Sequence, residues 1–191
     1  IRNVNILPPL LKIDGDLKIK EKENYILFVG KMDYAPNPDA VEFFLNKIFP
    51  HIRKVHSEIE FFIVGSNINE DLKKKWEKEK NVRVFINVPD VEPFYEKAVS
   101  FICPLRFGTG IKVKILEAMK CGAPVVTTEV GAEGMNVSDG KHLLIGRDEK
   151  DFANKVIELI ENKDLREYII KNAFLFVKKN YDIKVWIERI F

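Results

Sequence analysis

The chain has 191 residues, of which 46% are hydrophobic, and its 31 Lys and Arg against 29 Asp and Glu leave a formal net charge of +2. This composition is typical of one globular domain with a substantial core, and it lacks the strong basic excess of a nucleic-acid-binding protein. No apolar run approaches the roughly 20 residues that span a bilayer, and we expect no signal peptide. Cys103 and Cys121 are too few for a disulfide framework or a zinc site, so we expect reduced thiols, no metal and a cytoplasmic location.

The first 24 residues are predicted to be a leading strand and linker. "IRNVNILPPLL" has the pattern of a strand that runs into a Pro-Pro connector, and "IDGDLKIKEKEN" is polar. The chain begins with Ile1 rather than Met, and we expect it to be the second half of a longer protein. Residues 25–180 are predicted to form the main domain, followed by a separate helix over 181–191.

Strand-like and helix-like runs alternate from residue 25 onward. The apolar runs predicted to be strands are 25–30, 59–65, 82–86, 99–105, 124–128 and 142–146. The first predicted helix covers 38–56, with Asn37 as its N-cap and Pro38 at its first position. Near-continuous apolar strands between helices predict an α/β fold, a doubly wound Rossmann-like parallel sheet with helices on both faces. Such sheets bind ligands at the carboxyl ends of their strands.

The stretch "PLRFGTGIKVKILEAMKCGAPVV" (104–126) leads from a strand through a glycine-rich turn into a helix. A helix start offers free N–H groups to an anion, and the helix dipole favours that anion. The expected N–H donors are those of Gly110, Ile111 and Lys112. The expected cations are Arg106, Lys112 and Lys114. Because Lys114 and Glu117 share a helix face, a phosphate at the helix start and a ribose diol on Glu117 would together describe a nucleotide.

This stretch has two other interpretations. Lys114 and Glu117 could form an ordinary surface pair at helical spacing. A nicotinamide site is disfavoured because the first strand is followed by "VGKMDYAPN", with a single glycine, and "GTGIKV" has Val113 where the fingerprint needs its third glycine. No Walker sequence is present either.

Several segments, in order, resemble the carboxyl-terminal domain of retaining GT-B glycosyltransferases of the glycosyltransferase group 1 family (family 4). They are "ILFVGKMDYAPNPDAVEFF", "IEFFIVG", "VEPFYEKAVSFICPLRFGTGIKVKILEAMKCGAPVVTTEVGAEG" and "HLLIG". The resemblance covers about residues 25 to 180 and is most specific in "ILEAMKCGAPVV" and "VGAEG". It implies a nucleotide-sugar-binding domain that works with an acceptor domain on a preceding segment and transfers sugar with retention and without a metal or other cofactor.

The resemblance also implies roles for individual residues. Glu117 matches the glutamate that binds the ribose hydroxyls, and Lys31 matches a position near the phosphates that is usually arginine. Val88 lies in the loop that touches the nucleobase. The residues expected to bind the donor are Gly30, Val88, Thr109, Gly110, Ile111, Lys112 and Glu117. Those expected to stabilise the leaving diphosphate are Lys31, Arg106 and Lys114.

Two positions depart from the usual family pattern. Thr109 stands where the family has a glutamate near the transferred sugar, and Pro36 or a neighbour stands where a second lysine is usual. The chain is similar to a subgroup with "PLR-x-G-x-G-x-x-x-K-x-LEAM", in which Arg106 and Lys114 would supply the missing charge. An alternative for Arg106 is an ion pair with an acidic neighbour such as Asp33.

The expected function is therefore that of a donor-binding domain for a UDP- or GDP-linked sugar, with a saccharide or lipid-linked acceptor, in polysaccharide assembly. The alternatives are a degenerate binding or assembly module, which Thr109 favours, and a nucleotide-sugar epimerase. Membrane contact, at the inner face, is expected only through the full-length protein. In the family the last helix crosses back to the first domain, so Trp186, Ile190 and Phe191 are expected to lack cover and to favour a homodimer.

Overall fold

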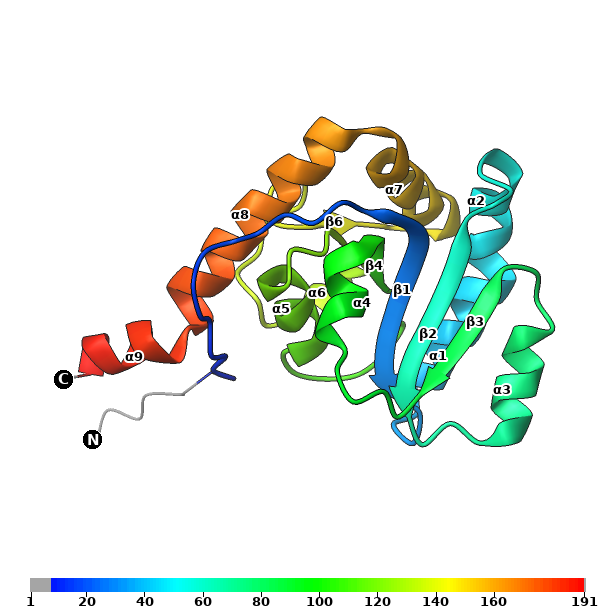
Figure 1. The fold of residues 1–191 in the computed structure, drawn as a ribbon, viewed down its shortest axis with the longest axis horizontal. Helices are drawn as coiled ribbons and strands as arrows, with labels where there is room; N and C mark the ends of the chain where they lie inside the picture. The colour runs from blue at the N-terminus through cyan, green and yellow to red at the C-terminus, as the bar shows by residue number, and fades with distance from the viewer. Residues whose placement is uncertain (1–7, 191) are drawn as a thin grey trace.

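The computed structural model describes residues 8–190, and its centre is a parallel sheet of six strands in the order β3-β2-β1-β4-β5-β6. The strands are β1 (Glu23–Lys31), β2 (Glu60–Ser66), β3 (Val82–Ile86), β4 (Ala98–Cys103), β5 (Val125–Thr127) and β6 (Leu144–Ile145). β2 and β3 are added on one side of β1, and β5 and β6 on the far side of β4, so the order in which strands are added reverses between β1 and β4 (Figure 1). This is the switch point of a doubly wound fold, and the predicted fold class is confirmed.

The apolar strands form because helices cover both of their faces. Ile26, Leu27 and Phe28 of β1 are fully buried, and so are Phe101 and Ile102 of β4. Parallel pairing places Ile26 opposite Phe61 on one side and opposite Ser100 on the other. A continuous apolar run, rather than an alternating one, is what a strand buried on both faces requires.

The described helices are α1 (Pro36–Phe43), η1 (Phe44–Ile48), α2 (Phe49–Val55), α3 (Glu70–Glu77), α4 (Glu92–Lys97), α5 (Val113–Lys120), α6 (Glu129–Ala132), α7 (Glu149–Glu161), α8 (Lys163–Tyr181) and α9 (Ile183–Ile190). α7 packs against η1, α2 and β4, whereas α4 contacts β1 and β4, and α5 packs between β5 and α8 (Figure 1). No helix in the described part of the chain is long and apolar enough to cross a bilayer.

The prediction for the first helix was wrong in two respects. The helix begins at Pro36 with Ala35 in the N-cap position, so Asn37 lies inside the first turn and is buried. The predicted single helix is also interrupted by the π-helical turn η1. Pro50, near the start of α2, lacks the N–H that would bond to the carbonyl four residues earlier, and a widened turn accommodates that loss.

Residues 8–22 form an irregular segment beside α8 and α9 rather than a strand (Figure 1). Leu11 makes an isolated parallel bridge to Asp182, and Ile13 is buried. Lys22 Nζ donates to the carbonyls of Glu96 (2.5 Å) and Gly122 (2.7 Å), which fastens the segment just before β1. The strand predicted at the start of the chain falls on residues 1–7, outside the described residues, and the assignment of 1–24 as an interdomain linker stays a prediction.

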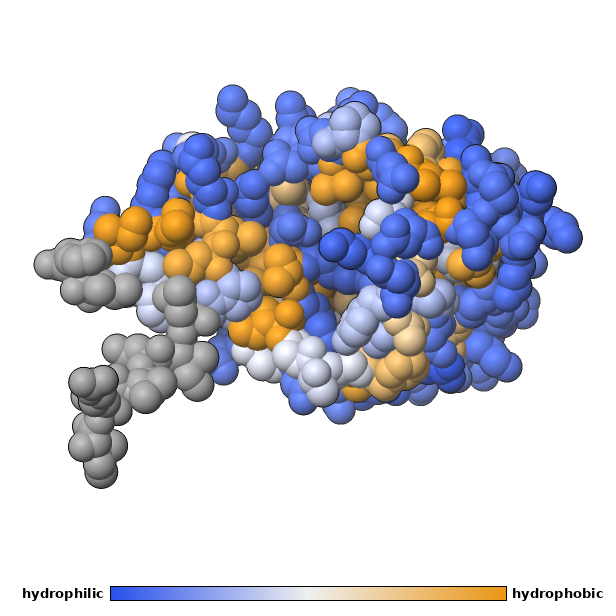
Figure 2. Space-filling model, turned by 90° about the horizontal axis from the view of Figure 1, so that it is seen from below, coloured by the Kyte–Doolittle hydropathy of each residue, from blue (hydrophilic) through white to orange (hydrophobic). Residues whose placement is uncertain are grey.

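The last helix, α9, exposes part of its apolar face. Ile183 and Ile187 are exposed, and Figure 2 shows apolar side chains gathered at this end of the molecule. Trp186, however, is only partly exposed and donates its indole N–H to the carbonyl of Asn180 (2.7 Å), so the expectation that it lacks cover was wrong. The side chain of Ile190 and the whole of Phe191 lie outside the described residues. The homodimer through this helix stays a prediction.

Candidate functional site

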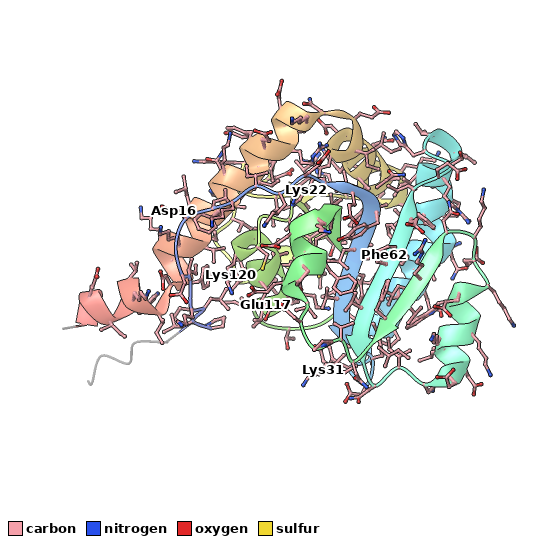
Figure 3. The ribbon with its side chains drawn as sticks, in the orientation of Figure 1. Asp16, Lys22, Lys31, Phe62, Glu117 and Lys120 are labelled. Carbon is pink, nitrogen blue, oxygen red and sulfur yellow. The ribbon has the colours of Figure 1, made fainter. Side chains whose placement is uncertain are left out.

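A pocket of about 600 Å³ opens at the carboxyl ends of β1, β2 and β3, beside α5. This is the end of the sheet at which the fold predicts ligand binding, next to the switch point between β1 and β4. Figure 3 shows Lys31 at the end of β1 and Glu117 on α5. The predicted site residues that line the pocket are Gly30, Lys31, Val88, Thr109, Ile111, Lys112, Lys114 and Glu117. Gly110 and Arg106 are not among its lining residues.

The helix after the glycine-rich turn begins later than predicted. α5 starts at Val113. Gly108 (φ +126°) and Gly110 (φ +74°) both have positive φ, which is incompatible with a right-handed helix, so the helix cannot include them. Gly110 therefore lies before α5 and not on it. Lys112 occupies the N-cap position in an extended conformation, and no side chain caps the helix. The free N–H groups in the first turn of α5 are thus those of Val113 and Lys114. The expected role of the N–H groups of Gly110, Ile111 and Lys112, which precede the helix, stays a prediction.

Lys114 presents an ammonium group at the pocket without a carboxylate partner. Its Nζ donates to Asn37 Oδ1 at 2.6 Å and lies 4.4 Å from the centre of the Phe28 ring. No carboxylate of the described residues lies within ion-pair distance of it. Burial lowers the pKa of the Lys114 ammonium, while Cys103 and Glu117 oppose that shift. A partly desolvated cation of this kind gains more from an incoming anion than an ordinary surface lysine does.

Glu117 lies one turn further along α5, and its carboxylate is partly buried in the same pocket. Burial raises the pKa of this carboxyl group, with Lys120 and Lys114 opposing the shift. No hydrogen bond or ion pair to any described residue occupies the carboxylate, so the surface pair with Lys114 that was weighed as an alternative does not form. Its oxygens remain available to accept hydrogen bonds from a ligand.

The other two predicted lysines differ from each other. Lys112 is nearly buried, with its Nζ donating to the carbonyl of Gly110 (2.6 Å) and lying 3.8 Å from the Glu133 carboxylate. Lys31 is exposed at the rim, and its carbonyl accepts a hydrogen bond from Asn37 Nδ2 (2.7 Å). Lys31 therefore keeps an exposed charge beside the pocket, whereas the charge of Lys112 is largely engaged within the protein.

Arg106 lies outside the pocket and is already paired. Its guanidinium donates twice to the Asp39 carboxylate, with Nε 3.0 Å from Oδ2, and lies 5.0 Å from the centre of the Phe43 ring. It lines a neighbouring hollow of about 440 Å³. The alternative of an ion pair is confirmed in kind, but the partner is Asp39 and not Asp33, which accepts from Asn67 instead.

Sequence reasoning missed several residues that line the pocket, namely Tyr34, Asn37, Ser66, Asn87, Val91 and Val113. Asn37 was interpreted as a helix cap, which is the commonest use of asparagine before a helix. Asn87 follows β3 in the left-handed conformation (φ +51°), which turns the loop back over the pocket. No cluster of three metal-ligating side chains occurs among the described residues.

The family comparison agrees with this geometry. The model of the family described as glycosyl transferases group 1 matches residues 23–162, from the start of β1 to the end of α7. The chain therefore belongs to the glycosyl transferases group 1 family. The family recognised from the sequence motifs is confirmed.

Curated relatives extend beyond this chain. A protein from the cps region of Klebsiella pneumoniae is 34% identical over 173 residues, which are 87% of this chain and 45% of that protein. A Campylobacter jejuni α-1,4-N-acetyl-D-galactosaminyltransferase acting on a diNAcBac-PP-undecaprenol-linked glycan is 28% identical over 159 residues, or 80% of this chain and 43% of that one. The chain thus spans less than half the length of these two relatives.

Solved structures share the fold at low sequence identity. A TarM variant from S. aureus, in complex with Fondaparinux, α-GlcNAc-glycerol and UDP, has a TM-score of 0.79 at 18% identity, covering 100% of this chain and 39% of that one. HepE from Anabaena, in complex with UDP and glucose, has a TM-score of 0.71 at 17% identity. The match covers 88% of this chain and 47% of HepE. The carboxyl-terminal domain of LpcC from Francisella tularensis has a TM-score of 0.65 at 17% identity. The match covers 85% of this chain and 89% of that domain. The fold is that of one half of a GT-B glycosyltransferase.

Proposed function

We propose that this chain is the donor-binding half of a retaining glycosyltransferase, and that its pocket holds a sugar linked to UDP or GDP. One observation carries the proposal: an ammonium group without a counter-ion and a carboxylate without a hydrogen bond face one pocket at the switch point. The first is suited to a phosphate and the second to a pair of hydroxyl groups. A nucleotide presents both.

The order of these groups along α5 fits the order of groups in a nucleotide. The diphosphate would be received by the N–H groups of Val113 and Lys114, by the Lys114 ammonium and by the exposed Lys31. Glu117, three residues or roughly 4.5 Å further along the helix axis, would receive the ribose hydroxyls. The loop after β3, with Asn87 and Val88, forms the remaining wall, where the nucleobase would lie.

The chemistry follows from where charge develops. As the bond from the sugar to the diphosphate breaks, negative charge builds on the departing phosphate oxygens. Pre-placed N–H groups and the Lys114 ammonium stabilise this charge more in the transition state than in the ground state. Glu117 would position the donor and transfer no proton. We propose that the acceptor, a saccharide or a lipid-linked saccharide, is bound by a segment outside this chain.

The relatives support a role in saccharide assembly. One is a transferase that acts on an undecaprenol-linked glycan, and another is a protein of a cps region. HepE and the TarM variant were solved with UDP bound. These observations favour a nucleotide-sugar donor without selecting its base or its sugar.

A second candidate is a binding module that no longer transfers sugar. Thr109 favours it, because this position lines the pocket with a neutral hydroxyl where the family pattern has a carboxylate near the sugar. Such a module need not bind a nucleotide tightly, so donor affinity distinguishes the two candidates.

The test is calorimetric titration of the chain with UDP, GDP and ADP. We expect one of them to bind and Glu117→Ala to weaken that binding about tenfold, the value of one or two hydrogen bonds to a charged group. Glu158→Ala removes an exposed carboxylate from α7, away from the pocket, and serves as the matched control. The donor-binding proposal fails if none of the three binds, or if both variants bind as the unmodified chain does.

A further inference from the structure

Among the described residues, Asn37 is the one buried asparagine, with 4% of its surface exposed. Its side chain joins two elements that line the pocket. It extends from the first turn of α1. Its Oδ1 accepts a hydrogen bond from Lys114 Nζ (2.6 Å), and its Nδ2 donates to the carbonyl of Lys31 (2.7 Å). The amide thus connects α5 to the end of β1 through α1.

The orientation of this amide follows from its two partners. An ammonium group can only donate and a carbonyl oxygen can only accept, so Oδ1 must face Lys114 and Nδ2 must face Lys31. A flipped amide would lose both hydrogen bonds. The carbonyl of Lys31 therefore fixes the direction from which Asn37 holds the Lys114 ammonium.

The surroundings of the ammonium contact it without pairing it with a carboxylate of any described residue. Asn37 offers a neutral oxygen, and the Phe28 ring offers its electron-rich face at 4.4 Å. Lys114 Nζ has three N–H donors, and Asn37 takes one of them, which leaves capacity for an anion. A lysine side chain loses considerable rotamer freedom when it binds, so a partner that orders it beforehand reduces that loss.

Gly30 leaves the space in which Asn37 and Lys114 meet. A Cβ at this position would lie 2.8 Å from Asn37 Nδ2 and 2.9 Å from Lys114 Nζ. Both atoms would have to move. An alanine here would therefore displace the pair without removing either of its members.

We propose that Asn37 is a positioning residue that holds the Lys114 ammonium at the pocket, as an un-neutralised cation, for the diphosphate of the donor. This inference rests on the proposed function and adds a residue that touches no reacting atom. It predicts that Asn37 affects the binding of a diphosphate, but not the binding of the nucleoside to which that diphosphate is attached.

The test compares a nucleoside diphosphate with its nucleoside. Affinities are measured by calorimetry for whichever of UDP, GDP and ADP binds best, and by NMR chemical-shift titration for the matching nucleoside. We expect Asn37→Ala to lower the diphosphate affinity about tenfold and to leave the nucleoside affinity within about twofold. In a Lys114→Met background, Asn37→Ala should cause no further loss. Asn46→Ala, on η1 with its Nδ2 bonded only to Glu42, is the matched control and should change neither affinity.

Two further variants keep the test decisive if Asn37→Ala does not fold. Asn37→Asp keeps the shape of the side chain but places a carboxylate as a counter-ion beside the Lys114 ammonium. Gly30→Ala displaces the side chains of both Asn37 and Lys114. Each should lower the diphosphate affinity selectively. Equal losses for nucleoside and diphosphate, no loss at all, or full additivity with Lys114→Met would overturn the positioning role. If the unmodified chain binds none of the nucleotides, the proposed function itself fails; binding that these variants leave unchanged refutes Asn37 alone.

Discussion

Lys114 and Arg106 are two cations on the segment that leaves β4, and they differ in what they already bind. Arg106 is exposed and makes a two-pronged ion pair with Asp39 of α1. Lys114 is partly buried, and among the described residues its one hydrogen-bond partner is the neutral oxygen of Asn37, also from α1. One element, α1, therefore supplies a carboxylate to the first cation and an amide to the second.

We propose that this difference separates a structural cation, Arg106, from a binding cation, Lys114. A surface ion pair is screened by water and contributes little to stability, yet its carboxylate competes with any incoming anion. A partly desolvated ammonium without a carboxylate has no such competitor. Two residues that look equivalent in the sequence thus have different partners, which α1 supplies, and we propose different functions for them.

Lys114→Met is the strongest test of the proposed difference between Lys114 and Arg106. We expect the affinity for a nucleoside diphosphate to fall about 10- to 100-fold, as is usual when a hydrogen bond between charged groups is lost. Because burial lowers the pKa of Lys114, the folded state binds this proton less tightly than the unfolded state does, and the charged group costs stability. The variant should therefore be as stable as the unmodified chain or more stable. Calorimetry and urea denaturation measure the two effects. Lys178→Met, which removes a half-buried lysine that lies near the Phe174 ring and pairs with Asp16 outside the pocket, is the control.

Glu117→Gln tests at the carboxylate whether a buried charge raises nucleotide affinity while it lowers folding stability. Burial raises the folded-state pKa of Glu117 above its ordinary value of 4.5, so the folded state binds this proton more tightly than the unfolded state does. The ionised group therefore lowers stability at pH 7, and this effect disappears below the ordinary pKa. We expect Glu117→Gln to be at least as stable as the unmodified chain at pH 7, with any gain vanishing as the pH falls below about 4.5, although it binds nucleotide more weakly. Urea titrations across this range would contradict the account if the variant were less stable at pH 7.

Arg106→Gln should have the smallest effect of the three. We expect nucleotide affinity to change by less than about threefold and the free energy of unfolding to fall by no more than about 1 kcal/mol, the usual range for an exposed ion pair. Arg83→Gln is the matched control, because Arg83 also pairs with a carboxylate (Glu60) and lies over an aromatic ring (Phe62). A tenfold loss of affinity in Arg106→Gln alone would show that Arg106 exchanges Asp39 for the ligand.

Much of the fold was predictable because it depends on patterns that are local in the sequence. The apolar runs of β1 and β4 are long enough to specify strands buried on both faces, and their alternation with helices specifies the parallel sheet. The start of α5 was less predictable. Its first residue depends on the positive φ of Gly110, a conformation that glycine permits but does not require.

The site was predicted in part. Lys114 and Glu117 could be placed in it because both follow the same glycine-rich turn and share one helix face. Asn37 was missed because a cap and a buried hydrogen-bonding residue have the same local sequence. Its role depends on Lys114, which lies 77 positions away.

The sequence by itself determined the family, the doubly wound sheet and the end of that sheet where a ligand would bind, because periodicity and short motifs act over a few neighbouring residues. Only the tertiary structure decided which cation is available there. The Arg106–Asp39 and Lys114–Asn37 contacts each join residues more than 60 positions apart, and such contacts exist only once α1 and α5 have packed at the same edge of the sheet.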